Sequence, residues 1–503
     1  MTFEESLTPQ QRKNRNDYES YLVHVVCMDK PEGYLETISG TSGKLKKLDD
    51  SFTGNLYDYS FSKDLKPFYD VIFASRDSRK ILDGKGNNTN STPFKKYMEM
   101  LWAREIFANS VICEAMPEEH PDYPEAKPTD AIKEYLKAIK AKPFLILGGF
   151  SGTGKSQSVK ELAYMTCADV NGLQQDKMMP GNYCLVSVKP NWHDSTDLLG
   201  YYSSINDKYF LTDFVRFLVK AMQSPNVPFF ACIDEMNLAP VEEYFAEYLS
   251  VLESREYNPT TKRIESAALL SKDVFTKSYG QFNIFNELGV AEDSKIAESL
   301  KKHGLRLPEN VVVIGTVNMD DTTHSFSRKV IDRAMTFETQ IKVFTADVFD
   351  NEGNLHYVSN PMNASEIMPE FASAKDAIAK LKADGVETEA LMKEVSEFIN
   401  EVNTALKGSP FQISYRVLNE TLLYYYANRT DNINEVFNAM LMRKVLPRIE
   451  GDQEKAQRPL NALLKWITDD KHDDEAFHNS KAKIMEMRKP FEDGGSGFTT
   501  FWN

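Results

Sequence analysis

The sequence predicts an α/β protein whose core is a doubly wound parallel sheet with a phosphate-binding loop. Two features predict this core: a phosphate-loop pattern that follows an apolar strand, and a second apolar strand that ends in two adjacent acids. Helical periodicity beyond residue 361 predicts a C-terminal helical lid. We expect a small α/β recognition or adaptor domain over 1–110, a linker over 111–128, the nucleotide-binding core over 129–345, the lid over 346–490 and a flexible tail over 491–503.

The composition is typical of a globular protein. Of the 503 residues, 42% are hydrophobic and 26% are charged. No apolar run reaches the roughly 20 residues that cross a bilayer, and the first residues are too acidic for a signal peptide, so we expect no membrane contact and a cytoplasmic location. The five cysteines form no C-x-x-C pair, which argues against a disulfide framework or a zinc site. The net charge of −15 argues against wrapping of DNA by the whole surface.

The N-terminal segment alternates short β-like runs, at 22–26 and 71–73, with breaks rich in Gly, Ser and Asn. This alternation predicts a small α/β domain. The segment is also rich in aromatic residues, which form either a base-stacking platform or part of the core and the edge strands. The aromatic residues in question are Tyr57, Tyr59, Phe61, Phe68 and Tyr69. A proline-rich acidic stretch then marks the linker.

The phosphate loop lies at 149–156 and fits G-x-x-x-x-G-K-[ST]. Its glycines permit a tight turn whose backbone N–H groups converge on phosphate, Lys155 supplies a positive charge, and Ser156 offers a hydroxyl to Mg²⁺. A helix that begins near Lys155 would direct its positive end at the same anion. The apolar run 143–147 and the helical pattern after the loop supply the expected strand and helix. We expect nucleotide contacts from Gly149, Ser151, Gly152, Thr153, Gly154, Lys155, Ser156 and Gln157.

The second chemical signal is the apolar strand 229–233 followed by Asp234 and Glu235, the Walker B pattern. Asp234 would lie at the carboxyl end of a parallel strand, where such sheets bind ligands, and would hold Mg²⁺ directly or through water. Glu235 would polarise the attacking water. Acid pairs at strand ends are common, so the pattern gains its meaning from the phosphate loop upstream.

The other core elements follow from apolar periodicity. We expect a strand at 183–188, a β-hairpin at 201–210, an amphipathic helix at 241–252 and a long polar insertion at 257–308. A buried strand over 310–318 then ends in Asn318. In a doubly wound sheet this end would lie next to Asp234, so the Asn318 amide could hydrogen-bond the attacking water or the γ-phosphate. The alternative is a plain turn residue.

The C-terminal part is helical, with segments expected at 386–406, 413–427 and 433–446, and with Gly-containing breaks between the first two and after the third. The tail carries the aromatic residues Phe498, Phe501 and Trp502. They either dock onto a neighbouring subunit or pack back on the lid.

Taken together, these motifs resemble the AAA+ superfamily of ring-forming ATPases. The resemblance covers 130–470 and is closest to the dynein-related branch that contains the McrB motor subunits of restriction systems. Four stretches carry it: V-S-V-K-P-N-W through L-L-G-Y at 186–201, D-E-M-N-L-A at 234–239, G-T-V-N-M-D-D at 315–321 and K-V-L-P-R-I-E-G at 444–451.

The resemblance implies roles for further residues. Asn318 matches the first sensor, and with Asp321 it falls on the McrB-like M-N-x-x-D-R signature, which departs here at Val317 and Thr322. Arg333 lies where the family places its arginine finger, with Arg328 as the runner-up, and either arginine could instead be a surface salt-bridge partner. Arg416 matches the second sensor.

The same resemblance implies how the protein works. A finger that enters the next subunit's site makes the contact heterologous, so a homo-oligomeric ring, usually a hexamer, is expected. The cofactors would be Mg²⁺ with ATP, the default of the superfamily, or GTP, the McrB exception. We see no nuclease pattern, so a McrC-like subunit would cut DNA, which the ring would contact directly or through that partner. The alternatives are a MoxR-like chaperone ATPase and a nucleotide-sensing assembly switch. The hairpin and the insertion would face the pore or a partner.

Overall fold

The computed structural model describes residues 123–280, 282–319, 326–339, 355–429, 432–469, 475–492 and 497–502, with a few residues before 102. The chain divides into two compact units, 1–122 and 123–503. In the first unit Tyr57 is fully buried, and its ring packs edge-on against Tyr97 at 5.6 Å between ring centres. Tyr57 is therefore a core residue, whereas the other four aromatic residues proposed as a platform lie outside the described residues. The second unit contains the predicted core and lid.

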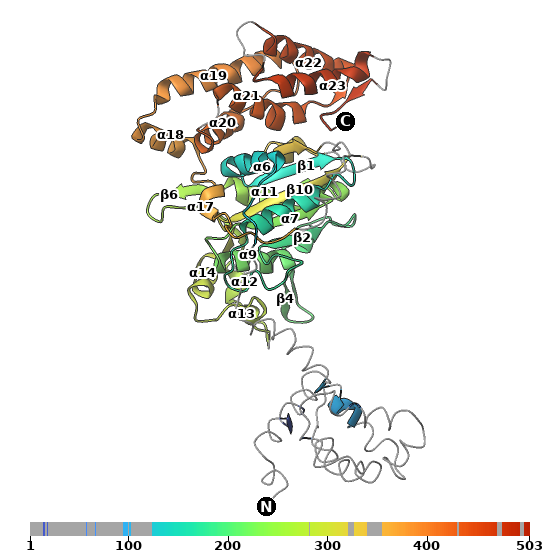
Figure 1. The fold of residues 1–503 in the computed structure, drawn as a ribbon, viewed down its shortest axis with the longest axis vertical. Helices are drawn as coiled ribbons and strands as arrows, with labels where there is room; N and C mark the ends of the chain where they lie inside the picture. The colour runs from blue at the N-terminus through green and yellow to red at the C-terminus, as the bar shows by residue number, and fades with distance from the viewer. Residues whose placement is uncertain are drawn as a thin grey trace, which may run out of the picture. The chain divides into compact units, whose positions relative to one another are not determined.

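Five parallel strands form the central sheet of the second unit (Figure 1). They are β1 (Phe144–Gly149), β2 (Tyr183–Ser187), β5 (Phe229–Asp234), β10 (Val311–Asn318) and β11 (Met335–Glu338). The order across the sheet is β11-β1-β10-β5-β2, and every pairing is parallel. The predicted doubly wound parallel sheet is therefore confirmed. Because all five strands point the same way, the residues that follow β1, β5 and β10 meet at one edge of the sheet.

Helices cover both faces of the sheet. Leu145 and Leu147 share one apolar cluster with α6 (Asp130–Ala141) and α7 (Lys155–Thr166). Phe144 and Ile146, which alternate with them along β1, belong to a second cluster on the other face. That cluster includes α9 (Asp213–Gln223), α10 (Val241–Tyr244) and α11 (Ala246–Glu253). The helix expected at 241–252 is thus two helices, which join at the buried Phe245.

The insertion is not the polar segment that the sequence suggested. It contains the hairpin β6 (Glu256–Asn258) and β7 (Arg263–Glu265), the pair β8 (Ala268–Leu270) and β9 (Leu305–Arg306), and the helices α12 (Asp273–Thr276), α13 (Ile284–Glu287) and α14 (Lys295–His303). Its apolar side chains are buried in the second cluster, among them Leu269, Leu270, Phe275, Phe285 and Leu300. Elements this short show no sustained period, so the apolar residues were not recognised as a core.

The predicted hairpin at 201–210 is confirmed as β3 (Tyr201–Ser203) and β4 (Lys208–Phe210), preceded by α8 (Thr196–Leu199). Asn318 at the end of β10 is level with Gly149 at the end of β1.

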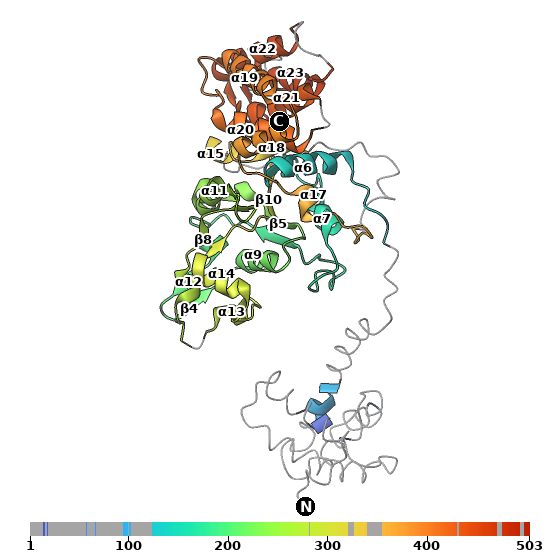
Figure 2. The same ribbon diagram turned by 90° about the vertical axis from the view of Figure 1, so that its left-hand side faces the viewer.

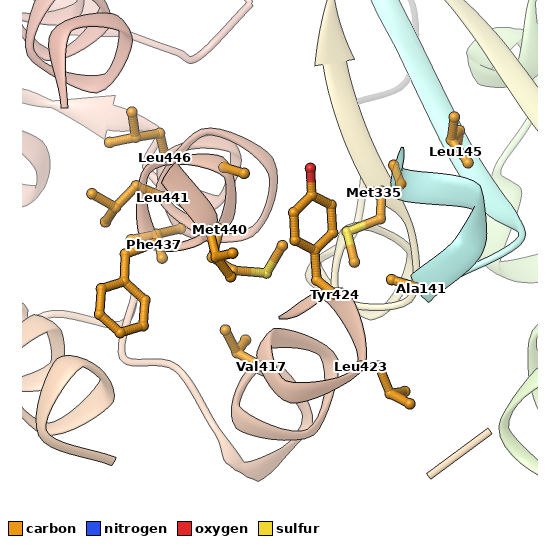
Figure 3. Close-up of a cluster of buried hydrophobic side chains, with 14 of the residues drawn as sticks. Ala141, Leu145, Met335, Val417, Leu423, Tyr424, Phe437, Met440, Leu441 and Leu446 are labelled. Atoms are coloured by element: carbon orange, nitrogen blue, oxygen red, sulfur yellow. The ribbon is translucent and has the colours of Figure 1, made fainter. Parts of the chain in front are cut away.

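The lid contains α17 (Ala364–Ile367), α18 (Ala374–Ala383), α19 (Thr388–Ala405), α20 (Tyr415–Ala427), α21 (Ile433–Met440), α22 (Gln453–Ile467) and α23 (His478–Glu492). In Figures 1 and 2, α6 lies on the side of the core that faces the lid, and it packs against α20. Figure 3 shows the shared apolar cluster, in which Val417, Tyr424 and Met440 of the lid face Ala141 and Met335 of the core.

The third predicted lid helix ends before residue 446. After Met440 the chain forms a π-helical turn, η4 (Leu441–Val445), and a 3₁₀ turn, η5 (Leu446–Arg448). Pro447 has no N–H to continue a regular helix, and the wider turn buries the Lys444 side chain.

The C-terminal tail, expected to be flexible, is packed. Phe498 and Thr499 form β13, which pairs with β12 (Gly451–Asp452), and Phe501 is 1% exposed in the core that the lid shares. The Trp502 ring covers Gly148, where an added Cβ would lie 2.3 Å from it. Of the two alternatives left open, the tail therefore packs back on its own chain. No helix among the described residues is both long and apolar enough to cross a membrane.

Candidate nucleotide-binding site

The phosphate loop follows β1 directly, as the sequence predicts. Gly152 and Gly154 both have φ +79°, a left-handed conformation that favours glycine, and α7 begins at Lys155. The space around both Cα atoms is open, so the backbone conformation, not crowding, requires glycine at these two positions. The first turn of α7 faces the loop with its N-terminal N–H groups and the positive end of its dipole. Ser151 and Gln157 lie in the loop and in this first turn.

Lys155 is held inside the loop. Its ammonium group donates to the carbonyl oxygens of Gly149 at 2.9 Å and Phe150 at 2.6 Å, and the residue is only 6% exposed. The positive charge is therefore already at the centre of the loop. Thr339, at the end of β11, braces the loop from outside: its N–H donates to the Gly148 carbonyl at 2.7 Å, and its hydroxyl lies 2.9 Å from that of Thr153.

A carboxylate and two hydroxyl groups meet at the ends of three elements. The Ser156 hydroxyl donates to Asp234 Oδ1 at 2.5 Å, and the Thr316 hydroxyl donates to the same oxygen at 2.7 Å. Hard oxygen donors of this kind fit Mg²⁺, which usually binds one or two protein oxygens and keeps its other positions for water and phosphate. The predicted metal residues Ser156 and Asp234 are thus brought together. Thr316 was missed, although it lies two residues before Asn318 on the same strand.

Glu235 and Asn318 also come together. The Asn318 side-chain amide donates to Glu235 Oε1 at 3.2 Å, and the Glu235 N–H donates to the Thr316 hydroxyl at 3.1 Å. The backbone of Glu235 is left-handed, with φ 53° and ψ 49°. These contacts direct the carboxylate at the edge where the phosphate loop lies. Asp321, the other residue of the sensor signature, lies outside the described residues.

The candidate arginines lie elsewhere. Arg333, which follows the short helix α15 (Arg328–Ile331), and Arg416, in the first turn of α20, both form ion pairs with the carboxylate of Glu253 at the end of α11. Burial lowers the pKa of Arg333, and Asp332 partly offsets this effect. Arg328 donates to the Pro410 carbonyl at 2.8 Å, and its guanidinium lies 5.1 Å from the centre of the Phe411 ring.

The strand register places Arg333 at the opposite edge of the sheet from the phosphate loop. Met335 is level with Leu145 and Glu338 with Gly148, so Arg333, two residues before Met335, is level with the start of β1. Six residues of β1 separate it from Gly149, about 20 Å at roughly 3.3 Å per residue. A small hollow of about 160 Å³ at this edge is lined by Pro143, Glu253 and Arg416, which confirms that Arg416 lies there too. The structure therefore does not bring Arg416 to its own phosphate loop.

Sequence reasoning missed Thr316, Thr339 and Glu253. The threonines are ordinary strand residues whose role depends on the pairing of distant strands. Glu253 is one of several acids near a helix end and shows no motif. The signal that could have found Thr316 is its alternation with Asn318 along one strand, since residues two apart point to the same face.

Comparisons with known proteins identify the two parts of the second unit separately. Residues 144–335 match the family model of the AAA domain (dynein-related subfamily), and residues 366–496 match a domain of unknown function, DUF8727. A solved structure of a candidate ATPase from Cytophaga hutchinsonii ATCC 33406 is 14% identical, and the match covers 69% of this chain and 90% of that one with a TM-score of 0.37. No curated protein sequence matches the chain.

Proposed function

We propose that this chain, whose residues 144–335 form a P-loop AAA+ domain of the dynein-related type, is a Mg²⁺-dependent nucleoside triphosphatase that works as a ring of subunits. The observation that carries the proposal is the separation of its functional groups. The phosphate loop, Asp234, Glu235 and Asn318 share one edge of the sheet, whereas Arg333 and Arg416 lie at the other edge. Arginines so placed cannot serve the site of their own subunit.

Each residue at the loop edge has a task that its contacts support. Lys155 and the loop N–H groups would bind the β- and γ-phosphates, and Ser156 and Asp234 would hold Mg²⁺, which when bound neutralises phosphate charge. Glu235 would polarise the attacking water and accept its proton. The Asn318 amide, 3.2 Å from Glu235 Oε1, would keep that carboxylate directed at the water.

The arginine edge would complete the site of the next subunit. Arg333 and Arg416 share the single carboxylate of Glu253, so the cluster keeps an excess of positive charge. A guanidinium that neutralises the developing charge on a neighbour's γ-phosphate is worth about 10³-fold or more in rate. A contact between two different surfaces closes into a ring when its rotation permits.

Mixing two inactive variants tests the ring. Lys155→Ala should lose nucleotide binding but keep its arginines, and Arg333→Ala should bind nucleotide but hydrolyse it poorly. In mixed rings a Lys155→Ala subunit can supply the arginine to an intact loop, so steady-state hydrolysis by the mixture should exceed that of both variants measured separately. A mixture no more active than its components would exclude an arginine acting between subunits.

We further propose that the ring drives a partner nuclease against foreign DNA, as the resemblance to McrB-type motors implies. An exposed hairpin supports contact with a long substrate. Ile205, at the tip between β3 and β4, is 93% exposed. Tyr202 braces the tip: its hydroxyl donates to Asp207 at 2.9 Å, and the Lys277 ammonium lies 3.3 Å from its ring centre.

Hydrolysis of ATP and of GTP, each with and without double-stranded DNA, tests this role. GTP preference with stimulation by DNA supports the McrB-like function. ATP preference without a DNA response would shift the conclusion to a protein-remodelling ATPase, and negligible turnover would favour an assembly switch.

A substitution at the tip of the hairpin tests whether the hairpin contacts DNA. Ile205→Asp should abolish stimulation by DNA because a charge replaces the apolar tip, while hydrolysis without DNA stays within about twofold of wild type, as expected for an exposed surface change. Val170→Asp, at another exposed apolar position, is the matched control and should keep the stimulation. If DNA stimulates Ile205→Asp as strongly as Val170→Asp, the hairpin does not contact the DNA.

A further inference from the structure

Two cations from the lid hold the segment that carries Arg333. Lys444, in the π-helical turn η4, donates to the carbonyl oxygens of Asp332 at 3.0 Å and Ala334 at 2.8 Å. These two residues flank Arg333 in the chain. The Lys444 side chain is 1% exposed, so it reaches these carbonyls through the packed interface between lid and core.

Arg448 makes a second, independent contact with the same segment. Its Nε atom lies 3.3 Å from Asp332 Oδ1, and the residue is nearly buried in the 3₁₀ turn that follows. Both cations belong to the K-V-L-P-R stretch at 444–448, which no step of hydrolysis explains. The irregular backbone here aims successive side chains differently: Arg443 pairs with Glu134 and stacks on Tyr424, away from Arg333.

The position of Lys444 is itself fixed by a buried charge network. Its ammonium group lies 2.5 Å from Glu420 Oε2 on α20, and Lys142, which directly follows α6 of the core, lies 2.9 Å from the other oxygen of the same carboxylate. Burial alone raises the pKa of Glu420, but the two lysines outweigh it and lower that pKa below its ordinary value. Burial lowers the pKa of Lys444.

Stability alone does not account for this network. Replacing a buried ion pair with apolar side chains of similar volume is often neutral or stabilising, so such a pair is weak evidence for a stabilising role. The contacts instead fix the position of the chain on either side of Arg333. Lys444 donates two hydrogen bonds to backbone carbonyls, and Arg448 forms an ion pair with the Asp332 carboxylate. A positioned catalytic group loses about 10²-fold in rate when it is displaced by about 1 Å.

We propose that Lys444 and Arg448 are positioning residues that fix the Arg333 segment for the nucleotide site of the next subunit. The inference rests on the proposed function. The lid of one subunit would thereby fix the position of the arginine that enters its neighbour's nucleotide site. Lys444 and Arg448 belong to the lid, whereas Asp332 and Ala334 belong to the core. A movement of the lid would therefore move the core segment that carries Arg333.

Crossed mixtures test the proposal. Lys444→Met should bind nucleotide normally and lower hydrolysis about 10- to 100-fold. Mixing it with Lys155→Ala should restore hydrolysis, because Lys155→Ala supplies a well-placed Arg333. Mixing it with Arg333→Ala should not, because neither subunit then offers a working arginine. If hydrolysis is instead restored by Arg333→Ala and not by Lys155→Ala, Lys444 acts on its own subunit's site and the proposal is overturned. Normal hydrolysis by Lys444→Met alone would also overturn it.

Two further variants guard against misfolding. Lys444→Met combined with Glu420→Gln leaves no unpaired buried carboxylate, and Arg448→Met removes the second contact; both should show the same crossed pattern. Lys483→Met is the matched control, since Lys483 is also a buried lid lysine that pairs with a core carboxylate, Glu338 at 2.6 Å. It should restore hydrolysis when mixed with Arg333→Ala. A mixture of Arg333→Ala and Lys155→Ala, measured alongside, separates the two proposals. If this mixture is no more active than its components, the ring itself is contradicted. If it is active but the Lys444 variants do not show the expected pattern, only the positioning role of Lys444 and Arg448 is contradicted.

Discussion

Glu235 has a strained backbone conformation, which points to a functional role and not only a structural one. A left-handed backbone costs a non-glycine residue about 1–3 kcal/mol, and such residues cluster at functional sites. Glu235 has this strained conformation, with φ 53°, and its carboxylate accepts a hydrogen bond from the Asn318 amide at the loop edge. Strain of this kind persists when the surroundings fix it, here through the hydrogen bond from the Glu235 N–H to Thr316.

Substitution of Glu235 tests the role of this carboxylate. Glu235→Gln should keep nucleotide affinity, since phosphates are bound by the loop, and should lower turnover about 10²- to 10⁴-fold because the amide cannot accept the proton of the attacking water. Steady-state hydrolysis and equilibrium nucleotide titration measure the two effects. Glu242→Gln, an exposed acid on the nearby α10, is the control and should hydrolyse within about twofold of wild type. Turnover of the Glu235 variant at the control's level would remove Glu235 from catalysis.

At the scale of elements, the sequence predicted four of the five core strands because each of these four is a largely apolar run. The fifth strand, β11, was not predicted, because its four residues, M-T-F-E, alternate with polar side chains and show no apolar run. The runs before Gly149, Glu235 and Asn318 were found at their observed places, and the parallel sheet brought their ends together as expected. The AAA+ fold inferred from these motifs is confirmed by the family match over 144–335. Local patterns sufficed here because the loop and the acids follow directly from the strands.

Other elements could not be predicted because their structure depends on distant contacts. The insertion buries single apolar residues from many short pieces, and the tail is ordered by pairing with β12, about 50 residues away along the chain. The position of Arg416 beside Glu253 is a contact across 163 residues that no spacing reveals. In the same way, the π-helical turn that places Lys444 has no sequence signature of its own.

The packed tail gives a prediction about stability. Gly148→Ala should lower the free energy of unfolding by about 1–3 kcal/mol, because the new methyl group would lie 2.3 Å from the Trp502 ring and 2.8 Å from Met319. Combining it with Trp502→Ala should cost less than the sum of the two single changes, since the smaller residue removes the main clash. Urea unfolding of the four proteins measures this coupling. Additive effects would show that Trp502 does not cover Gly148 in solution.

At the scale of the whole molecule, the proposed ring would assign the two edges of one sheet to two different nucleotide sites. The loop edge would bind nucleotide, and the arginine edge, about 20 Å away, is joined to the lid by Lys444 and Arg448. In the proposed ring, a single chain would hold most of one site and one group of the next. Hydrolysis should require assembly, and the lid that adjoins one nucleotide should influence the arginine offered to another.

Assembly itself is the last prediction. With Mg²⁺ and nucleotide, Glu235→Gln should form a particle of about six times the 57.3 kDa chain mass, because bound nucleotide that is not hydrolysed keeps a γ-phosphate for the neighbour's arginine. Light scattering after size-exclusion chromatography measures the mass with ATP and with GTP in turn. Lys155→Ala should give the same mass with and without nucleotide, and Arg333→Ala should need more nucleotide to assemble than Glu235→Gln. A Glu235→Gln protein that stays monomeric with both nucleotides would contradict the ring, and assembly with only one of them would identify the base that the site selects.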